Sequence, residues 1–214
     1  MPWFPLIGGA IGAIAGAVRV GLDPLVGRGP STVLAIATLV LITGALHQDA
    51  LADTADGLGV RGDRERRLAV MRDSTLGAFG VLALITWALL LVAALGSLTP
   101  EHALRALVAA GATGRLAALI HGVSAPPARN NGLGAGLHVT IRSTAAATVV
   151  AASIAIAAAG PARGALALAL AAAVGACSAA HARSVVGGRT GDTLGAAVTL
   201  GEVCVCLALV ATWR

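Results

Sequence analysis

Long apolar segments take up most of this sequence, separated by short loops that hold much of its charge. Apolar and aromatic residue types make up 57%, charged residues only 12%, and the mean hydropathy is +0.87. A soluble domain carries about 25% charged residues, and a membrane-spanning helix needs about 20 apolar residues. The 214 residues therefore predict an all-α, polytopic integral membrane helix bundle that forms a single domain, 1–214. They exclude a soluble domain and a disordered chain.

About seven transmembrane helices are expected from the apolar runs, with six as the alternative count. The first cation is Arg19, so the chain does not begin with the basic segment of a signal peptide. The expected spans cover residues of about 4–20, 32 to beyond 46, 75–98, 103–123, 143–159, 164–182 and 193–213.

The charge pattern predicts how the spans are oriented. All fifteen Lys and Arg positions are arginine, and the net charge is +5. Nucleic-acid binding is not expected, because the chain has no Tyr and only 2% aromatic residues on which bases could stack. The arginines concentrate after the second, fourth and sixth spans, and loops rich in arginine stay in the cytoplasm. Three cytoplasmic motif loops are therefore predicted at about 47–74, 124–142 and 181–192.

Six of the ten acidic residues fall within positions 49–73. Asp49, Asp53 and Asp56 are spaced so that a helix would carry them within an arc of about 60°. Such a stripe is costly, because the charges repel and lie next to the membrane. A divalent cation would offset both costs, and carboxylate oxygens favour Mg²⁺ or Mn²⁺ over Zn²⁺. Two alternatives stay open, a solvated helix end and the proton or cation path of a transporter.

Other polar residues of the motif loops are candidate ligand contacts. Arg129 and Asn130 lie in a loop broken by prolines and glycines, and Arg189 lies in a glycine-rich turn before the last span. Asp192 fits either a metal site or a helix N-cap. Further arginines that could hold phosphate follow the acidic stripe: Arg61, Arg64, Arg66, Arg67 and Arg72.

Two ionisable residues lie deeper in the predicted bundle. Arg115 sits inside the fourth span and Glu202 inside the seventh. Counted from the cytoplasmic ends, their depths differ by less than the reach of an arginine side chain. They form either a structural pair or the wall of a polar cavity that admits substrate.

Four segments resemble the cobalamin synthase family, the adenosylcobinamide-GDP ribazoletransferases. Residues 47–57, HQDALADTADG, resemble the family signature H-x-D-G-L-A-D-T-x-D-G. The segments DRERRLAVMRDSTLGAFGVLAL, ARNNGLG and GGRTGDTLGA also resemble family segments, in the expected order. Two features depart from the family pattern. Ala50 stands where members usually carry Gly, and members usually carry an additional segment before the WFPL stretch at residues 3–6.

The resemblance implies a membrane enzyme that joins α-ribazole, or its 5′-phosphate, to adenosylcobinamide-GDP and releases GMP. It implies Mg²⁺, the cytoplasmic (inner) membrane of a prokaryote, and an active site on the cytoplasmic face. Self-association or association with other cobalamin-assembly enzymes is left open. The expected catalytic and metal residues are Asp49, Asp53 and Asp56, with Asp49 favoured as the base. The expected substrate-binding residues are His47, Arg61, Asp73, Arg129, Asn130, Arg189 and Asp192.

Two other functions remain as alternatives. A CDP-alcohol phosphotransferase would use the same metal and pyrophosphate chemistry, but the signature D-G-x-x-A-R followed by G-x-x-x-D-x-x-x-D is not present here. A cation-coupled transporter would also need carboxylates near the membrane, without a nucleotide substrate.

Overall fold

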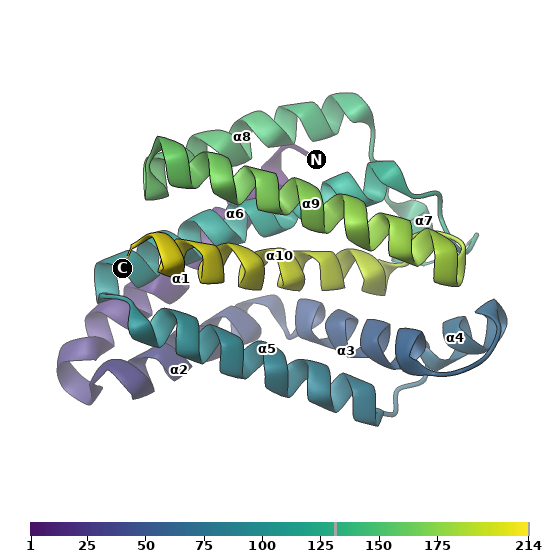
Figure 1. Ribbon diagram of the computed structural model, residues 1–214, viewed down its shortest axis with the longest axis horizontal. Coiled ribbons are helices and arrows are strands. Elements are labelled where there is room, and N and C mark those ends of the chain that lie inside the picture. The colour runs from purple at the N-terminus through teal and green to yellow at the C-terminus, as the bar shows by residue number, and fades with distance from the viewer. Residues whose placement is uncertain (131, 214) are drawn as a thin grey trace.

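The computed structural model describes residues 1–130 and 132–213, and these form a helix bundle (Figure 1). Six helices are each long and apolar enough to cross a membrane, and a bent pair, α2 and α3, passes the same test together. This confirms the predicted all-α, polytopic architecture. In chain order the helices are α1 (Trp3–Val26), α2 (Arg28–Thr43), α3 (Leu46–Gly59), α4 (Arg64–Val70), α5 (Ala78–Ser97), α6 (Pro100–Ser124), α7 (Leu133–Gly136), α8 (Ile141–Ala159), α9 (Pro161–Val186) and α10 (Gly191–Thr212).

The bundle is built around α6 and α10, whose surfaces are mostly buried. Helix α6 contacts α1, α8, α9 and α10. The buried core is rich in alanine, whereas large apolar side chains such as Leu82, Ile85 and Val149 point outward. Lipid tails solvate apolar side chains, so helix association in a membrane relies on small residues that let backbones approach. This distribution therefore fits a bundle surrounded by lipid.

Helices α1 and α6 pack with their backbones in close contact. A Cβ atom added to Gly8 would lie 2.1 Å from the carbonyl oxygen of Gly111, and one added to Gly12 would lie 2.1 Å from that of Leu107. Neither position can hold a side chain unless one helix backbone moves. Glycine thus sets the α1–α6 separation.

We expect Gly12→Ala to lower the free energy of unfolding by about 1–3 kcal/mol, the usual cost of overpacking. Gly21→Ala in the same helix is the matched control, because a Cβ there meets nothing within 4 Å. It should be neutral or stabilising by up to about 1 kcal/mol, since alanine favours helix more than glycine does. Unfolding midpoints in detergent would test the pair, and equal midpoints for the two variants would contradict the packing argument.

The second predicted span is broken. Gly44 and Ala45 both adopt positive φ angles, of 60° and 59°, and the chain turns by 89° between α2 and α3. The expected continuous run from residue 32 to beyond 46 is therefore wrong. The acidic signature lies on α3, a helix of its own that packs against α5 and α10.

The motif segments gather at one end of the bundle. The connections α3–α5, α6–α8 and α9–α10 lie there, at the right in Figure 1, with the turns α1–α2, α5–α6 and α8–α9 at the other end. Two of these connections are joined directly, because Pro127 and Arg189 form an isolated β-bridge. In the described residues, the connections after spans two, four and six thus lie at the same end of the bundle.

Candidate active site

Helix α3 carries Asp49, Asp53 and Asp56, as the spacing predicted, but their surroundings differ. Asp49 is exposed, Asp53 is half-buried and Asp56 is buried. The charges of Asp49 and Asp56 both act on the Asp53 carboxylate. The three carboxylates therefore lie on one helix but differ in their exposure to solvent.

Asp56 caps another helix. One carboxylate oxygen accepts a hydrogen bond from the Gly77 amide (2.8 Å) and the other from the Gly80 amide (2.9 Å), at the N-terminus of α5. Amides in the first turn of a helix have no partner within the helix, and a carboxylate also complements the positive end of the helix dipole. A Cβ atom on Gly77 or Gly80 would lie 2.4 Å from an Asp56 oxygen, so a side chain at either position would displace the capping carboxylate. The structure gives Asp56 this capping role where a metal-binding role was expected.

Asp192, from the third motif segment, lies near the remaining two carboxylates. Its charge acts on Asp53, and the charge of Asp49 acts on Asp192. Asp192 is not the N-cap of α10, because Thr190 holds that position and its hydroxyl accepts from the Thr193 amide. Instead, Asp192 sits in the first turn and accepts a hydrogen bond from the Thr190 hydroxyl (3.2 Å).

No group of three or more His, Cys, Asp or Glu side chains among the described residues forms a ready-made metal cage. Mg²⁺ rarely uses such a cage, since it keeps several waters and binds one or two carboxylates together with substrate phosphates. Asp49 and Asp53, with Asp192 nearby, match this coordination preference of Mg²⁺. They do not fit a four-ligand structural zinc site.

A polar cavity of about 200 Å³ opens beside Asp192. Of the three arginines that line it, Arg72 and Arg129 both attract the Asp192 carboxylate. Partial burial, followed by the neighbouring Arg72, lowers the pKa of Arg129, whereas Asp192 opposes the shift. The rest of the lining is Met71, Gly132, Gly134, Ala135, Arg189, Thr190 and Gly191.

A second, mainly apolar cavity of about 260 Å³ lies on the other side of Asp192. Gly191 and Asp192 line both spaces, so the two cavities adjoin. His47 and Asp49 line the apolar one together, although they do not share a stripe of α3. The remaining lining residues are Phe4, Leu46, Ala50, Arg115, Ala118, Leu119, Leu137, Leu194, Gly195 and Val198.

Several arginines that were expected to hold phosphate donate to backbone carbonyls. Arg129 makes one such bond, to Leu68 (3.0 Å), and other arginines make more. The Arg64 side chain donates to Val186 and Ala128, which ties α4 to the other two motif segments. The Arg67 side chain donates to the carbonyls of Leu58 and Gly57 near the C-terminal end of α3.

Arg189 has the most extensive set of such bonds. Its guanidinium donates to the carbonyls of Gly122, Ala125, Gly134 and Leu137, at 2.6–3.1 Å. Burial lowers the pKa of this group. The structure thus gives Arg189 a role in holding residues 122–125 to residues 134–137, where a phosphate contact was expected.

Arg189→Gln should loosen residues 125–130 and 132–137, which lie between α6 and α8. Hydrogen bonds to a charged group contribute about 1.5–3 kcal/mol each, and a tenfold change corresponds to about 1.4 kcal/mol, so losing one or two of these bonds should speed backbone amide exchange there by roughly 100-fold. Hydrogen–deuterium exchange would measure it. Arg183→Gln is the matched control, because that exposed arginine donates a single, long hydrogen bond among residues 1–130 and 132–213, to the Ser124 carbonyl (3.5 Å). Unchanged exchange in the Arg189 variant would contradict the ordering role.

The other predicted residues lie outside both cavities. Arg61 and Asn130 are exposed. Asp73 is exposed too, and hydrogen bonds from the Thr75 hydroxyl and amide lower its pKa. The structure therefore brings together His47, Asp49, Asp53, Arg129 and Asp192, and it does not bring Arg61, Asp73 or Asn130 to them.

Some site residues were missed or only partly anticipated. Arg115 forms the buried ion pair with Glu202, between α6 and α10, that was one of the two alternatives given for it, and it also lines the apolar cavity. Phe4 reaches the same cavity only because α1 packs on α6, and no local pattern in the sequence signals that contact. Arg72 was predicted only as one of five arginines that could hold phosphate. The structure singles it out, because it lines the polar cavity beside Arg129.

Comparison with known proteins identifies relatives of this chain. The family model for cobalamin-5-phosphate synthase matches residues 1–210. The adenosylcobinamide-GDP ribazoletransferase of Mesorhizobium japonicum is 41% identical over 207 residues, covering 94% of this chain and 78% of the relative. That of Klebsiella pneumoniae strain 342 is 39% identical over 210 residues, covering 96% and 85%. That of Azorhizobium caulinodans is 35% identical over 208 residues, covering 93% and 79%. No solved structure matches the chain.

Proposed function

Because this chain belongs to the cobalamin-5-phosphate synthase family, we propose that it is an adenosylcobinamide-GDP ribazoletransferase. It joins α-ribazole, or its 5′-phosphate, to adenosylcobinamide-GDP and releases GMP. The observation in the structure that carries the proposal is the meeting of three motif segments around Asp192. Asp49 of α3 lines the apolar cavity with Asp192, and Asp53 lies one turn further along α3. Arg72, from the segment after α4, and Arg129, from the loop after α6, line the polar cavity with Asp192.

The reaction moves a phosphoryl group, and this chemistry needs positioning and charge neutralisation more than covalent help. A ribazole hydroxyl attacks the phosphorus next to cobinamide, a new P–O bond forms, and the bond to GMP breaks. Arg72 and Arg129 neutralise pyrophosphate oxygens in the polar cavity through charge-assisted hydrogen bonds. Asp49, which borders the apolar cavity, accepts the hydroxyl proton. The apolar lining of that cavity suits the aromatic base of ribazole.

We further propose that Asp49 and Asp53, with Asp192, hold Mg²⁺ together with the pyrophosphate of the substrate. When bound, Mg²⁺ supplies Lewis-acid stabilisation of the charge on the phosphate oxygens. The chain's own contribution is to keep these carboxylates together, because α3 packs against α10 along this stretch. A side-chain contact supports this packing, since the Thr199 hydroxyl donates to the His47 carbonyl (3.1 Å).

The arginine pattern supports a cytoplasmic site. The end of the bundle that carries the motif segments also carries Arg61, Arg64, Arg66, Arg67 and Arg72. Arginine-rich connections stay on the cytoplasmic side, so we propose that the motif end faces the cytoplasm, in a bacterial inner membrane. Both nucleotide-derived substrates would then reach the site without crossing the bilayer.

The test is GMP release by the purified protein in liposomes, given adenosylcobinamide-GDP and α-ribazole, with Mg²⁺ or with EDTA. We expect release that requires both substrates and the metal, together with formation of the corrinoid product. Release from a CDP-alcohol instead would favour the other phosphotransferase. Carboxylate-dependent uptake of a solute without GMP release would favour the transporter. Folded protein that gives no GMP under any of these conditions would overturn the proposal.

A further inference from the structure

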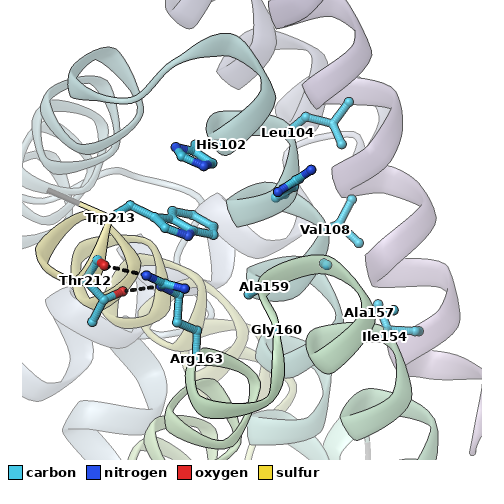
Figure 2. Close-up of a pocket in the computed structure, with 12 residues that line it drawn as sticks. His102, Leu104, Val108, Ile154, Ala157, Ala159, Gly160, Arg163, Thr212 and Trp213 are labelled. Atoms are coloured by element: carbon cyan, nitrogen blue, oxygen red, sulfur yellow. Dashed lines mark hydrogen bonds between the residues drawn. The ribbon is translucent and has the colours of Figure 1, made fainter.

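A larger cavity lies at the end of the bundle away from the candidate active site. It measures about 1000 Å³ and opens between the first turns of α6, the last turns of α8, the start of α9 and the end of α10 (Figure 2). It shares no lining residue with the polar or apolar cavities. Nothing in the proposed reaction uses it.

One wall of this cavity is cationic and aromatic. Arg105, Arg163 and His102 line it, and no carboxylate side chain belongs to its lining. The Arg163 side chain is held in place, because it donates to the Thr212 carbonyl (2.7 Å) and the Thr212 hydroxyl (3.2 Å) (Figure 2). Its guanidinium also lies 5.6 Å from the centre of the Trp213 ring, on which His102 stacks at 4.7 Å.

Arg105 differs from Arg163 because it is not used by the fold. It is exposed and has no hydrogen bond or ion pair to any residue in the described ranges. The N-termini of α6 and α9, whose dipoles favour anions, also border the cavity. The wall is therefore suited to a negatively charged group and is only partly neutralised by the protein.

The opposite wall is apolar. Leu104, Val108 and Ile154 line it, and Ala157 and Ala158 leave room where α8 ends. These residues lie in the first three turns of α6 and the last two turns of α8, both long enough to cross a membrane, so the wall would run from the head-group level toward the hydrocarbon. Trp213 is typical of this level, since tryptophan collects at membrane interfaces. An anion that fits both walls carries a phosphate at one end and a hydrocarbon chain at the other.

We propose that this cavity binds an anionic phospholipid, taken from the leaflet opposite the candidate active site. The phosphate lies among Arg105, Arg163 and His102, and an acyl chain follows the wall of Leu104, Val108 and Ile154. A soluble phosphate would use the cationic wall alone. The apolar wall is what favours a lipid as the source of the phosphate.

The test uses the full chain in detergent, with phosphatidylglycerol or phosphatidylcholine added. Phosphatidylglycerol should raise the unfolding midpoint and stay bound in native mass spectrometry, whereas phosphatidylcholine should do so less. An arginine near the membrane surface contributes about 1 kcal/mol to the binding of anionic lipid, or about fivefold in affinity. Arg105→Gln should therefore weaken phosphatidylglycerol binding about fivefold. Arg142→Gln, an exposed arginine at the other end of α8, should leave it unchanged.

A second pair of variants tests the cavity without removing charge. Ala157→Phe should fill the space at the end of α8 and release the lipid, whereas Ala146→Phe adds the same side chain at an exposed site on α8 outside the cavity. Equal retention of phosphatidylglycerol by the Arg105 and Ala157 variants and the unaltered protein would overturn the proposal. So would equal binding of both lipids, or stabilisation by inorganic phosphate or glycerol 3-phosphate as large as that by phosphatidylglycerol, which would identify a soluble anion as the ligand.

Discussion

Asp53→Asn is expected to lower the rate of GMP release about 1000-fold while leaving the protein folded. Asp53 lies among the negative charges of Asp49, Asp56 and Asp192, so removing its charge relieves repulsion and should not destabilise α3. The same change removes a proposed metal ligand. A metal that neutralises phosphate charge contributes several kcal/mol to the transition state, and each 1.4 kcal/mol corresponds to a tenfold change in rate. Turnover across a Mg²⁺ titration, together with the unfolding midpoint, would measure both effects.

Asp63→Asn is the matched control for that experiment. Asp63 is an exposed carboxylate in the same acidic segment, and it caps α4 by accepting from the Arg66 amide (2.9 Å). Asparagine caps helices about as well as aspartate, so this variant should keep both stability and turnover. Full Mg²⁺-dependent activity in the folded Asp53 variant would remove Asp53 from the proposed metal site.

Asp56→Ala is expected to act on stability. It leaves the part-buried amide of Gly77 and the buried amide of Gly80 without the acceptor that they have in the structure. An unpaired buried donor costs about 1–3 kcal/mol, so the two together should lower the free energy of unfolding by about 3 kcal/mol. For a chain of this length that corresponds to an unfolding midpoint lower by roughly 6–12 °C. Asp56→Asn should recover part of the loss, because it keeps one acceptor oxygen.

The two aspartates are three positions apart, but the effects predicted for them differ: the Asp53 variant loses turnover and the Asp56 variant loses stability. The Asp53 variant should be folded and inactive, and the Asp56 variant unstable, with turnover that recovers in proportion to the folded fraction at low temperature. An Asp56→Ala protein with an unchanged midpoint and lost Mg²⁺ dependence would return Asp56 to the metal site and contradict the capping role. The unfolding midpoint and the Mg²⁺ titration separate the two outcomes.

Local sequence rules predicted most helices well, because long apolar runs and caps act over a few residues. The fourth predicted span, 103–123, became α6 at Pro100–Ser124, and its earlier start has a local cause: the Thr99 hydroxyl accepts from the His102 amide and Pro100 occupies the first turn. The break at Ala45 could not be predicted in this way. A non-glycine residue with positive φ is uncommon, and no proline marks the site.

The sequence by itself determined that the chain is a helical membrane protein, that its three motif segments share one face, and that Asp49, Asp53 and Asp56 lie on one helix. Tertiary structure decided what these residues do. Asp56 became a cap because the start of α5 packs against α3, and Asp53 acquired Asp192 as a neighbour because α10 packs there as well. Arg189 likewise donates hydrogen bonds to backbone carbonyls that lie more than fifty positions away in the chain. Helical periodicity places residues along a single helix, whereas the partner of a buried charge depends on which helices meet, and that is a property of the whole bundle.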